Sequence, residues 1–361
     1  MDNIVKFAFS ALNPFVTTNK VDSSEKEVSG KDFILWGSDN KYPIFLWELY
    51  NSCSALQSVI NGTADFIVGD DISCSAPQFT LVVNKDGETL IDLVKKITID
   101  YLIYGGFAIQ VVKNLNNKPI EMYHIDFTAI RSDKKNEVFF YSEDWEKSAG
   151  RVKYIVYPKW GKDDQNPTSI YYYKGDKTRT TYPIPIYNAA ITAIQVQAKI
   201  DEFHLNEISN NFLSSKLINF NSGVPEDGMK NQIERSINEK FSGSENAGRI
   251  MVSFNDSKDN ETTITDLATD NFADRYATLS KRTESQIFTA FRATPNLFGL
   301  PTETTGFNEQ EYESAFKLYN RTAVRPIQKT ICDIFDKITG IKNCITITPY
   351  SLENNNEKTV S

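Results

Sequence analysis

Few side chains in this sequence could perform acid–base chemistry. Its only histidines are His124 and His204. His124 lies on a predicted strand two residues before Asp126, whose carboxylate could orient the imidazole as a general base. His204 lies in a predicted helix near Glu202 and Glu207. Because a hydrogen-bonded structural histidine is the commoner case, we expect that role at both positions and predict no catalytic residue.

Metal and cofactor ligands are scarce as well. The cysteines form no C-x-x-C pair, and no histidine is placed to complete a zinc site. Neither G-x-x-x-x-G-K-[ST] nor G-x-G-x-x-G occurs, so no cradle for nucleotide phosphates is predicted. We therefore expect no metal, no cofactor and no enzymatic activity, and scattered thiols favour synthesis in a reducing cytoplasm. The cysteines are Cys53, Cys74, Cys332 and Cys344.

Acidic pairs and a tyrosine run also favour structural roles. The pairs Asp70-Asp71 and Asp163-Asp164 fall in predicted polar turns, where charge is usually solvated. The run from Tyr171 to Tyr173 could stack on nucleic-acid bases, but a strand with alternate rings buried is the favoured interpretation.

Composition limits the class of partner. The chain has 361 residues, a formal charge of −8 and 40% hydrophobic residues, which is typical of a globular protein of two or three packed units. An acidic protein does not wrap nucleic acid by general attraction. Any duplex DNA it handles would be DNA that must slide past it, as through a channel. No run of 18 apolar residues exists, so no membrane-spanning segment is predicted.

The first half of the chain changes from helices to strands. Residues 1–30 are polar and predict a mobile arm. Hydrophobic spacing then predicts three helices, and β-branched and aromatic alternation predicts strands up to Tyr182. The helices are expected after Pro43 and over 54–67 and 90–103, and the strands over 107–113, 120–125, 138–141, 152–157 and 170–173.

Two long helices flanking a small α/β unit are the most informative feature of the second half. The first is expected over 188–215 and the second over 271–293, each with an apolar stripe. Between them we expect a strand over 216–220, a helix from 225 or 226 to 241, a strand over 249–254 and a further strand over 262–267. The stripe of the first helix comprises Ile191, Ile194, Ala198, Leu205, Ile208 and Phe212.

A loop and a last helix complete the pattern. Residues 294–307 contain two prolines and two glycines and predict a loop. A final helix is expected over 309–338 with a kink at Pro326, followed by a short strand at 345–348 and a loose polar tail. The whole pattern predicts an α+β fold.

Several segments of the second half of the sequence resemble those of a known family. Asn188-Ala-Ala-Ile through Phe212, then Gly223-Val-Pro, Ser242-Gly-Ser-Glu-Asn-Ala-Gly-Arg-Ile-Met-Val and Phe291-Arg-Ala-Thr-Pro-Asn-Leu-Phe-Gly are similar, in order and spacing, to portal proteins of long-tailed phages. The last helix has a similar Thr-x-x-x-Pro step, here Thr322-Ala-Val-Arg-Pro. The likeness covers about residues 50–338.

The resemblance implies a portal fold with named parts. It divides the chain into an α/β wing at 31–187, stem helices at 188–215 and 271–293, a clip at 216–270, a tunnel loop at 294–307, and a C-terminal wing helix with a reduced crown at 308–361. The stripe of the first stem helix would then pack between subunits. The tunnel loop would face DNA through Leu300, Pro301, Thr302, Glu303 and Thr304. The clip would dock partners through Glu226, Asp227, Lys230, Glu234 and Arg235, although a charged helix face is more often only solvated.

The implied function is structural. Such a protein forms a ring of about twelve subunits at a capsid vertex, through which double-stranded DNA is packaged and ejected. The implied partners are the terminase large subunit, a head–tail adaptor protein and the major capsid protein. The protein would be made in the host cytoplasm and reside in the virion. Two alternatives stay open at this stage: an intracellular enzyme whose site is assembled from distant residues, and another tail or baseplate component.

Overall fold

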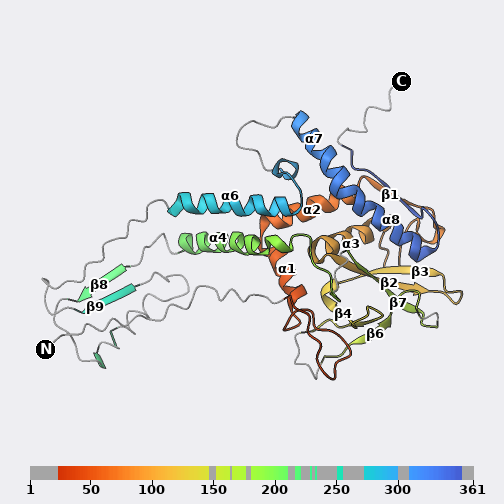
Figure 1. The fold of residues 1–361 in the computed structure, drawn as a ribbon, viewed down its shortest axis with the longest axis horizontal. Helices are drawn as coiled ribbons and strands as arrows, with labels where there is room; N and C mark the ends of the chain where they lie inside the picture. Colours follow the sequence, from red (N-terminus) through yellow and green to blue (C-terminus); the bar gives the residue numbers. More distant parts are fainter. Residues whose placement is uncertain are drawn as a thin grey trace. The chain divides into compact units, whose positions relative to one another are not determined.

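The computed structural model describes residues 23–145, 152–162, 165–175, 180–209, 216–220, 228–229, 232–233, 250–254, 272–299 and 309–351. The chain divides into two compact units. The first comprises residues 1–191 and 287–361, and the second comprises residues 192–286. The mixture of helices and sheets confirms the predicted α+β class (Figure 1).

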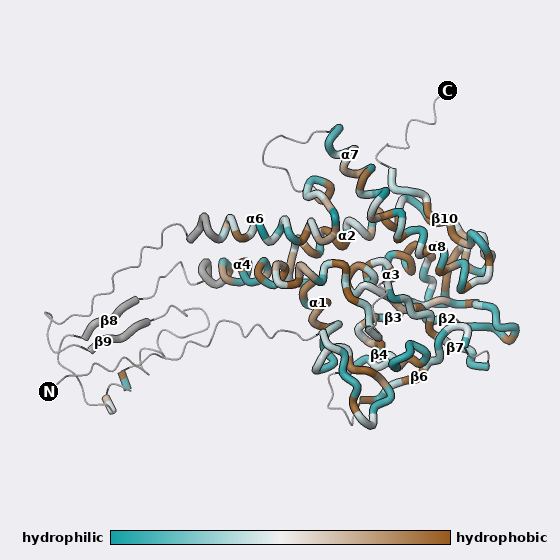
Figure 2. The backbone as a smooth tube through the Cα atoms, viewed as in Figure 1, coloured by the Kyte–Doolittle hydropathy of each residue, from teal (hydrophilic) through white to brown (hydrophobic). Residues whose placement is uncertain are grey.

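Three helices begin the first unit, as predicted. They are α1 (Tyr42–Ser52), α2 (Ser54–Val68) and α3 (Leu90–Tyr104). Helix α3 begins with a capping box in which the Thr89 side chain and the Asp92 side chain bond reciprocally to backbone N–H groups. It ends at Gly105, whose φ of +83° few other residues adopt. Helix α2 is largely hydrophobic, in keeping with its burial (Figure 2).

A three-stranded antiparallel sheet follows α3, in the order β3-β2-β7. The predicted hairpin is confirmed, because β2 pairs directly with β3. The prediction for the tyrosine run was wrong in one respect: Tyr171, Tyr172 and Tyr173 are all half-buried. Rings cover both faces of β7, since Tyr172 stacks on Phe127 and Phe139 while Tyr173 packs near Tyr101. The strands are β2 (Gly106–Lys113), β3 (Pro119–Ile125) and β7 (Thr168–Lys174).

A second antiparallel sheet has the order β4-β5-β6. Its strands are β4 (Ile130–Ser132), β5 (Val138–Tyr141) and β6 (Ile155–Pro158), so the last strand begins three residues later than predicted. A buried cluster of Phe33, Leu35, Phe140 and Trp145 packs beside this sheet. Two short 3-10 helices, η1 (Pro77–Phe79) and η2 (Phe127–Ala129), join neighbouring elements.

Part of the predicted mobile arm, residues 1–30, is packed against the fold, and residues 1–22 lie outside the described residues. Lys26 forms an antiparallel bridge with Leu35. The Glu25 carboxylate accepts a hydrogen bond from the backbone N–H of Tyr182 at 2.6 Å. These contacts tie residues 25–30 to segments that are distant in sequence, which a single polar stretch does not reveal.

A buried arginine connects several of these segments. Arg131 on β4 is fully buried, and its guanidinium donates to the Asn40 side chain and carbonyl and to the Thr128 carbonyl. It also lies 4.9 Å from the ring centroid of Trp145. The charge is therefore held by amide and carbonyl oxygens and by an aromatic face.

The C-terminal part differs from the single kinked helix that we predicted. Helices α7 (Glu309–Tyr319) and α8 (Arg325–Thr339) are joined by a π-helical turn, η6 (Asn320–Val324). Pro326 lies in the first turn of α8, and Thr322, four residues before it, lies in the π-helical turn, so the missing N–H of Pro326 falls where the helix widens. The interruption therefore lies before the proline and is a wider turn of helix.

The last strand closes onto the first unit's N-terminal half. Strand β10 (Ile345–Thr348) confirms the short strand predicted there and pairs antiparallel with β1 (Asp71–Cys74). Strand β1 was not predicted, because its residues were interpreted as part of a polar turn. Asp71 begins this strand instead.

The second unit contains most of both long helices. Helix α4 (Ile191–Ser209) follows a 3-10 turn, η3 (Asn188–Ala190), and α6 is Phe272–Ala290. Strands β8 (Lys216–Phe220) and β9 (Ile250–Phe254) pair in parallel, as expected when a helix crosses between them. Residues 228–229 and 232–233 are helical. The rest of the helix predicted over 225–241 and the strand predicted over 262–267 lie outside the described residues.

Candidate functional site

The two long helices pair through polar and aromatic contacts. Gln197 on α4 accepts hydrogen bonds from Ser280 and Thr283 on α6, at 3.2 and 2.6 Å between the heavy atoms. One helical turn or more further along, Phe203 stacks on Tyr276 with ring centroids 5.0 Å apart. Helix α6 is mostly hydrophilic (Figure 2), so hydroxyl groups replace part of an apolar seam.

The predicted stem stripe lies on another side of α4. Successive residues of a helix are turned by about 100°, so Ala198 and Leu205 point away from the direction of Gln197 and Phe203. Ile194 is buried, Ile191 and Ala198 are half-buried, and Leu205 is 63% exposed. Leu205 therefore lies off the face that pairs the helices within one chain, whereas Ile194 of the same stripe is buried. Ile208 belongs to α4 but its side chain lies outside the described residues, as does Phe212.

Aromatic packing fixes the root of the predicted tunnel loop. After α6 the chain forms a short 3-10 helix, η5 (Pro295–Phe298), whose Phe298 ring packs against Phe66, Phe288 and Tyr319. Gly62 on α2 leaves the space for this ring, because a Cβ there would lie 2.7 Å from it. Thr63 and Tyr319 share a hydrogen bond of 2.7 Å between their hydroxyl oxygens. The chain therefore enters the predicted tunnel loop from a packed position at Phe298.

The loop and clip residues themselves lie outside the described part of the chain. This applies to Leu300, Pro301, Thr302, Glu303 and Thr304, and to Glu226, Asp227, Lys230, Glu234 and Arg235. In the helix predicted over 225–241, Met229 is described and is 58% exposed.

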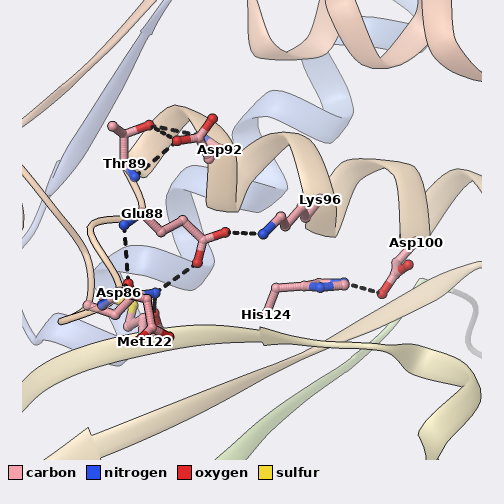
Figure 3. Close-up of polar contacts among 9 residues, drawn as sticks. Asp86, Glu88, Thr89, Asp92, Lys96, Asp100, Met122 and His124 are labelled. Carbon is pink, nitrogen blue, oxygen red and sulfur yellow. Dashed lines mark hydrogen bonds and ion pairs between the residues drawn. The ribbon is translucent and has the colours of Figure 1, made fainter.

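The histidine that could have been a base is bonded to a different carboxylate from the one predicted. His124 Nε2 lies 2.7 Å from Asp100 Oδ2 on α3, not from Asp126 (Figure 3). Burial raises the pKa of Asp100 to about 6, against the opposing hydrogen bond and charge of His124. For His124, burial lowers the pKa, but the hydrogen bond and charge of Asp100 outweigh it and the net pKa is raised. The pair is a proton-sharing contact between α3 and β3.

A signal for Asp100 was present in the sequence. The residue stands three positions after Ile97 and seven after Leu93, both of which lie on the buried stripe of α3. A carboxylate on an apolar stripe needs a buried donor, and His124 is one of only two histidines. Asp100 is 24 positions from His124, so proximity in the chain does not indicate this pair.

The Asp100–His124 pair predicts that the protein is more stable in mild acid. Because the pKa of Asp100 is raised from 3.8 to about 6, the folded state holds a proton between these pH values that the unfolded state releases. Stability therefore falls as pH rises through that window. Because the pKa of His124 is also raised, stability falls further as pH rises above 6.5, the ordinary pKa of histidine. The pair should make the free energy of unfolding about 2 kcal/mol lower at pH 8 than at pH 4.5.

This pH dependence is measured by urea unfolding of the wild type and of Asp100→Asn. Asparagine keeps an acceptor for the His124 N–H but does not titrate near neutrality. The variant should lose most of the pair's contribution to the pH slope. An equal slope in the two proteins would contradict the assignment.

The other predicted site residues show no catalytic arrangement. His204 is exposed and lies edge-on to Tyr276, with ring centroids 5.6 Å apart. Within the described residues, no group of three or more His, Cys, Asp or Glu side chains could hold a metal ion. No helix in that part of the chain has the length and apolar composition needed to cross a bilayer.

The chain combines two paired long helices, a small α/β unit between them in the sequence, and a loop whose start is held by aromatic packing. This combination defines a class of subunit that solved structures share. Solved structures with this fold include the virion of a native gene transfer agent particle, at 16% identity over 85% of this chain and 83% of that chain, with a TM-score of 0.51. The neck of an empty gene transfer agent particle, computed with C6 symmetry, matches at 18% identity over 86% and 85%, with a TM-score of 0.52.

A third similar structure is an HK97 family phage portal protein from Corynebacterium diphtheriae, at 13% identity over 82% of this chain and 91% of that chain, with a TM-score of 0.51. No curated protein matches the sequence. The model of the family described as phage portal protein matches residues 83–352. The chain belongs to the phage portal protein family. It is a structural component of the virion that forms the portal at the capsid vertex, which sets aside a tail or baseplate component.

Proposed function

We propose that twelve copies of this chain form a closed ring through which double-stranded DNA enters and leaves the capsid. The family match over residues 83–352 carries the proposal. A neck structure of a gene transfer agent particle with the same fold was computed with C12 symmetry, which supports the subunit number. A ring built from one repeated head-to-tail contact closes at a fixed number of subunits.

We assign the parts of the portal as follows. The described helices α4 and α6 are the stem, the α/β unit containing β8 and β9 is the clip, and most of the first unit is the wing. The segment that leaves Phe298 is the tunnel loop. These assignments are supported by the element order and by the anchored root of the loop.

The proposed partners follow from the ring. The clip docks the terminase large subunit during packaging and a head–tail adaptor protein afterwards, and the wing contacts the major capsid protein. The acidic charge of the chain, −8, supports a channel that guides DNA without gripping it. The subunit is made in the host cytoplasm before it is built into the virion.

Electron microscopy of the purified chain, combined with native mass measurement, tests the ring. The expected result is a ring of about twelve subunits with a central hole wide enough for duplex DNA. A monomer or dimer at micromolar concentration would overturn the ring as an autonomous assembly. Co-expression with the capsid protein then shows whether assembly requires it.

Leu205→Asp is expected to weaken ring assembly without unfolding the chain. Leu205 belongs to the predicted stem stripe of α4 and is 63% exposed in the single chain. If the stripe packs against the next subunit, the variant buries a carboxylate at every interface. The protein concentration at half-assembly should rise about tenfold or more, which corresponds to ~1.4 kcal/mol per contact.

Leu115→Asp is the matched control. Leu115 is fully exposed at the turn between β2 and β3, so the same substitution is made at an exposed leucine far along the chain from the stem. Both variants should keep the thermal unfolding midpoint of the dissociated chain. Equal assembly of the Leu205→Asp variant and the wild type would remove the stripe from the interface.

A further inference from the structure

Two thiols meet at one end of the β1–β10 sheet. The Sγ atoms of Cys74 and Cys344 lie 3.8 Å apart, although the residues are 270 positions apart in the chain. Cys74 is the last residue of β1 and stands opposite Ile345. Cys344 directly precedes β10 and is buried, whereas Cys74 is partly exposed. The arrangement therefore pairs one accessible thiol with one enclosed thiol.

The backbone on both sides of this thiol pair is held in place. The N–H of Ser75 donates to the Cys344 carbonyl at 2.8 Å, and the Ser75 hydroxyl donates to the same oxygen at 3.2 Å. Asp336 on α8 accepts from the N–H groups of Asn343 and Cys344 at 2.9 and 2.8 Å. A disulfide requires the sulfurs to approach to about 2 Å. Because β1 and β10 are already paired, we expect rotation of the two cysteine side chains to bring the sulfur atoms together.

We propose that Cys74 and Cys344 are a disulfide-forming modification site that clamps β10 to β1 once the protein meets a small-molecule disulfide, such as oxidised glutathione, outside a reducing compartment. The accessible Cys74 thiolate attacks one sulfur of glutathione disulfide and releases one glutathione thiolate. The Cys344 thiolate then attacks the Cys74 sulfur of this mixed disulfide and releases the second. One glutathione disulfide is reduced to two glutathione thiols, and the two cysteines are oxidised.

The clamp would act on a short strand pair. Strands β1 and β10 form a two-stranded sheet of four residues each, which is marginal without further support. Strand β1 follows α2 and β10 follows α8. The disulfide would therefore link two segments that lie near opposite ends of the chain and would close the chain between Cys74 and Cys344 into one covalent loop. Burial raises the pKa of Cys74 to about 11, so the reaction is slow at neutral pH and the site remains reduced during synthesis.

The test compares the full-length reduced protein with protein incubated overnight with glutathione disulfide at pH 8.5. Cleavage before aspartate residues places every cysteine in a different peptide, with Cys74 in 71–85 and Cys344 in 336–361. Non-reducing mass spectrometry should find these two peptides joined with loss of two hydrogens. The thermal unfolding midpoint should rise by about 5 °C or more and return on addition of dithiothreitol.

Cys74→Ser is the first control and Cys332→Ser the second. The Cys74→Ser variant should match the reduced wild type in thermal midpoint and lose the shift caused by oxidation. The Cys332→Ser variant should keep both the shift and the linked peptide. Linkage of Cys344 to Cys332, or a glutathione adduct on Cys74 with no crosslink, would overturn the proposal.

Discussion

Replacing Asn40 by alanine is expected to lower the free energy of unfolding by about 3 kcal/mol. The Asn40 side-chain oxygen accepts from Arg131 Nε at 2.5 Å and from the backbone N–H of Trp36 at 3.1 Å. Arg131 is fully buried. Alanine would leave a charged N–H group and a backbone N–H group in the protein interior without these acceptors. Asparagine also tolerates the φ of +66° at this position better than alanine does.

The loss is measured by guanidinium unfolding followed by tryptophan fluorescence. Asn117→Ala is the matched control, because Asn117 has a φ of +59° but is exposed in the β2–β3 turn. It should cost about 1 kcal/mol, the share due to backbone conformation. If Asn40→Ala were no more destabilising than Asn117→Ala, the buried hydrogen bonds would have little energetic weight.

A second substitution separates charge from packing. Arg131→Met removes the guanidinium while keeping a long apolar side chain beside Trp145. In the Asn40→Ala background it should cost less than it does in the wild type, because the unpaired charge is already present there. A strictly additive double variant would show that the two side chains do not depend on one another.

Deletion of residues 300–305 is expected to leave the ring intact and to abolish DNA packaging. The root of the loop is held by the packing of Phe298 against Phe66, Phe288 and Tyr319, which the deletion does not touch. If the loop faces the channel, its removal takes away the surface that guides the duplex during translocation. Nuclease-protected DNA in particles assembled with the variant should fall to background.

A substitution of equal length makes this experiment sharper. Replacing residues 300–305 by a Gly-Ser repeat keeps the chain length while removing Pro301 and Glu303. We expect an intermediate amount of protected DNA, because a flexible loop still occupies the channel. Full protection in particles carrying the deletion would exclude the loop from translocation, and loss of rings would show instead that it supports assembly.

Local patterns in the sequence were sufficient for most elements. The helices α1 to α3, the β2–β3 hairpin and the order of long helix, α/β unit and long helix follow from hydrophobic periodicity and from glycine and proline positions. The π-helical form of the turn before α8 could not be predicted in this way, because a proline indicates a disturbed helix but not how the turn is widened. Strand β1 was missed because it pairs with β10, which is more than 270 residues away in the chain.

The order and spacing of motifs were enough to indicate the family, and hydrophobic periodicity, which is a local property, was enough to indicate the α+β class. The pairs of distant side chains became visible only in the folded chain: His124 with Asp100, Arg131 with Asn40, Cys74 with Cys344, and Phe298 with Gly62. The fold also shows that Leu205 is exposed in the single chain, off the face of α4 where Gln197 meets Thr283. The physical reason is that burial and long-range contact depend on how elements pack, and a single chain's local pattern does not specify the partner of each face.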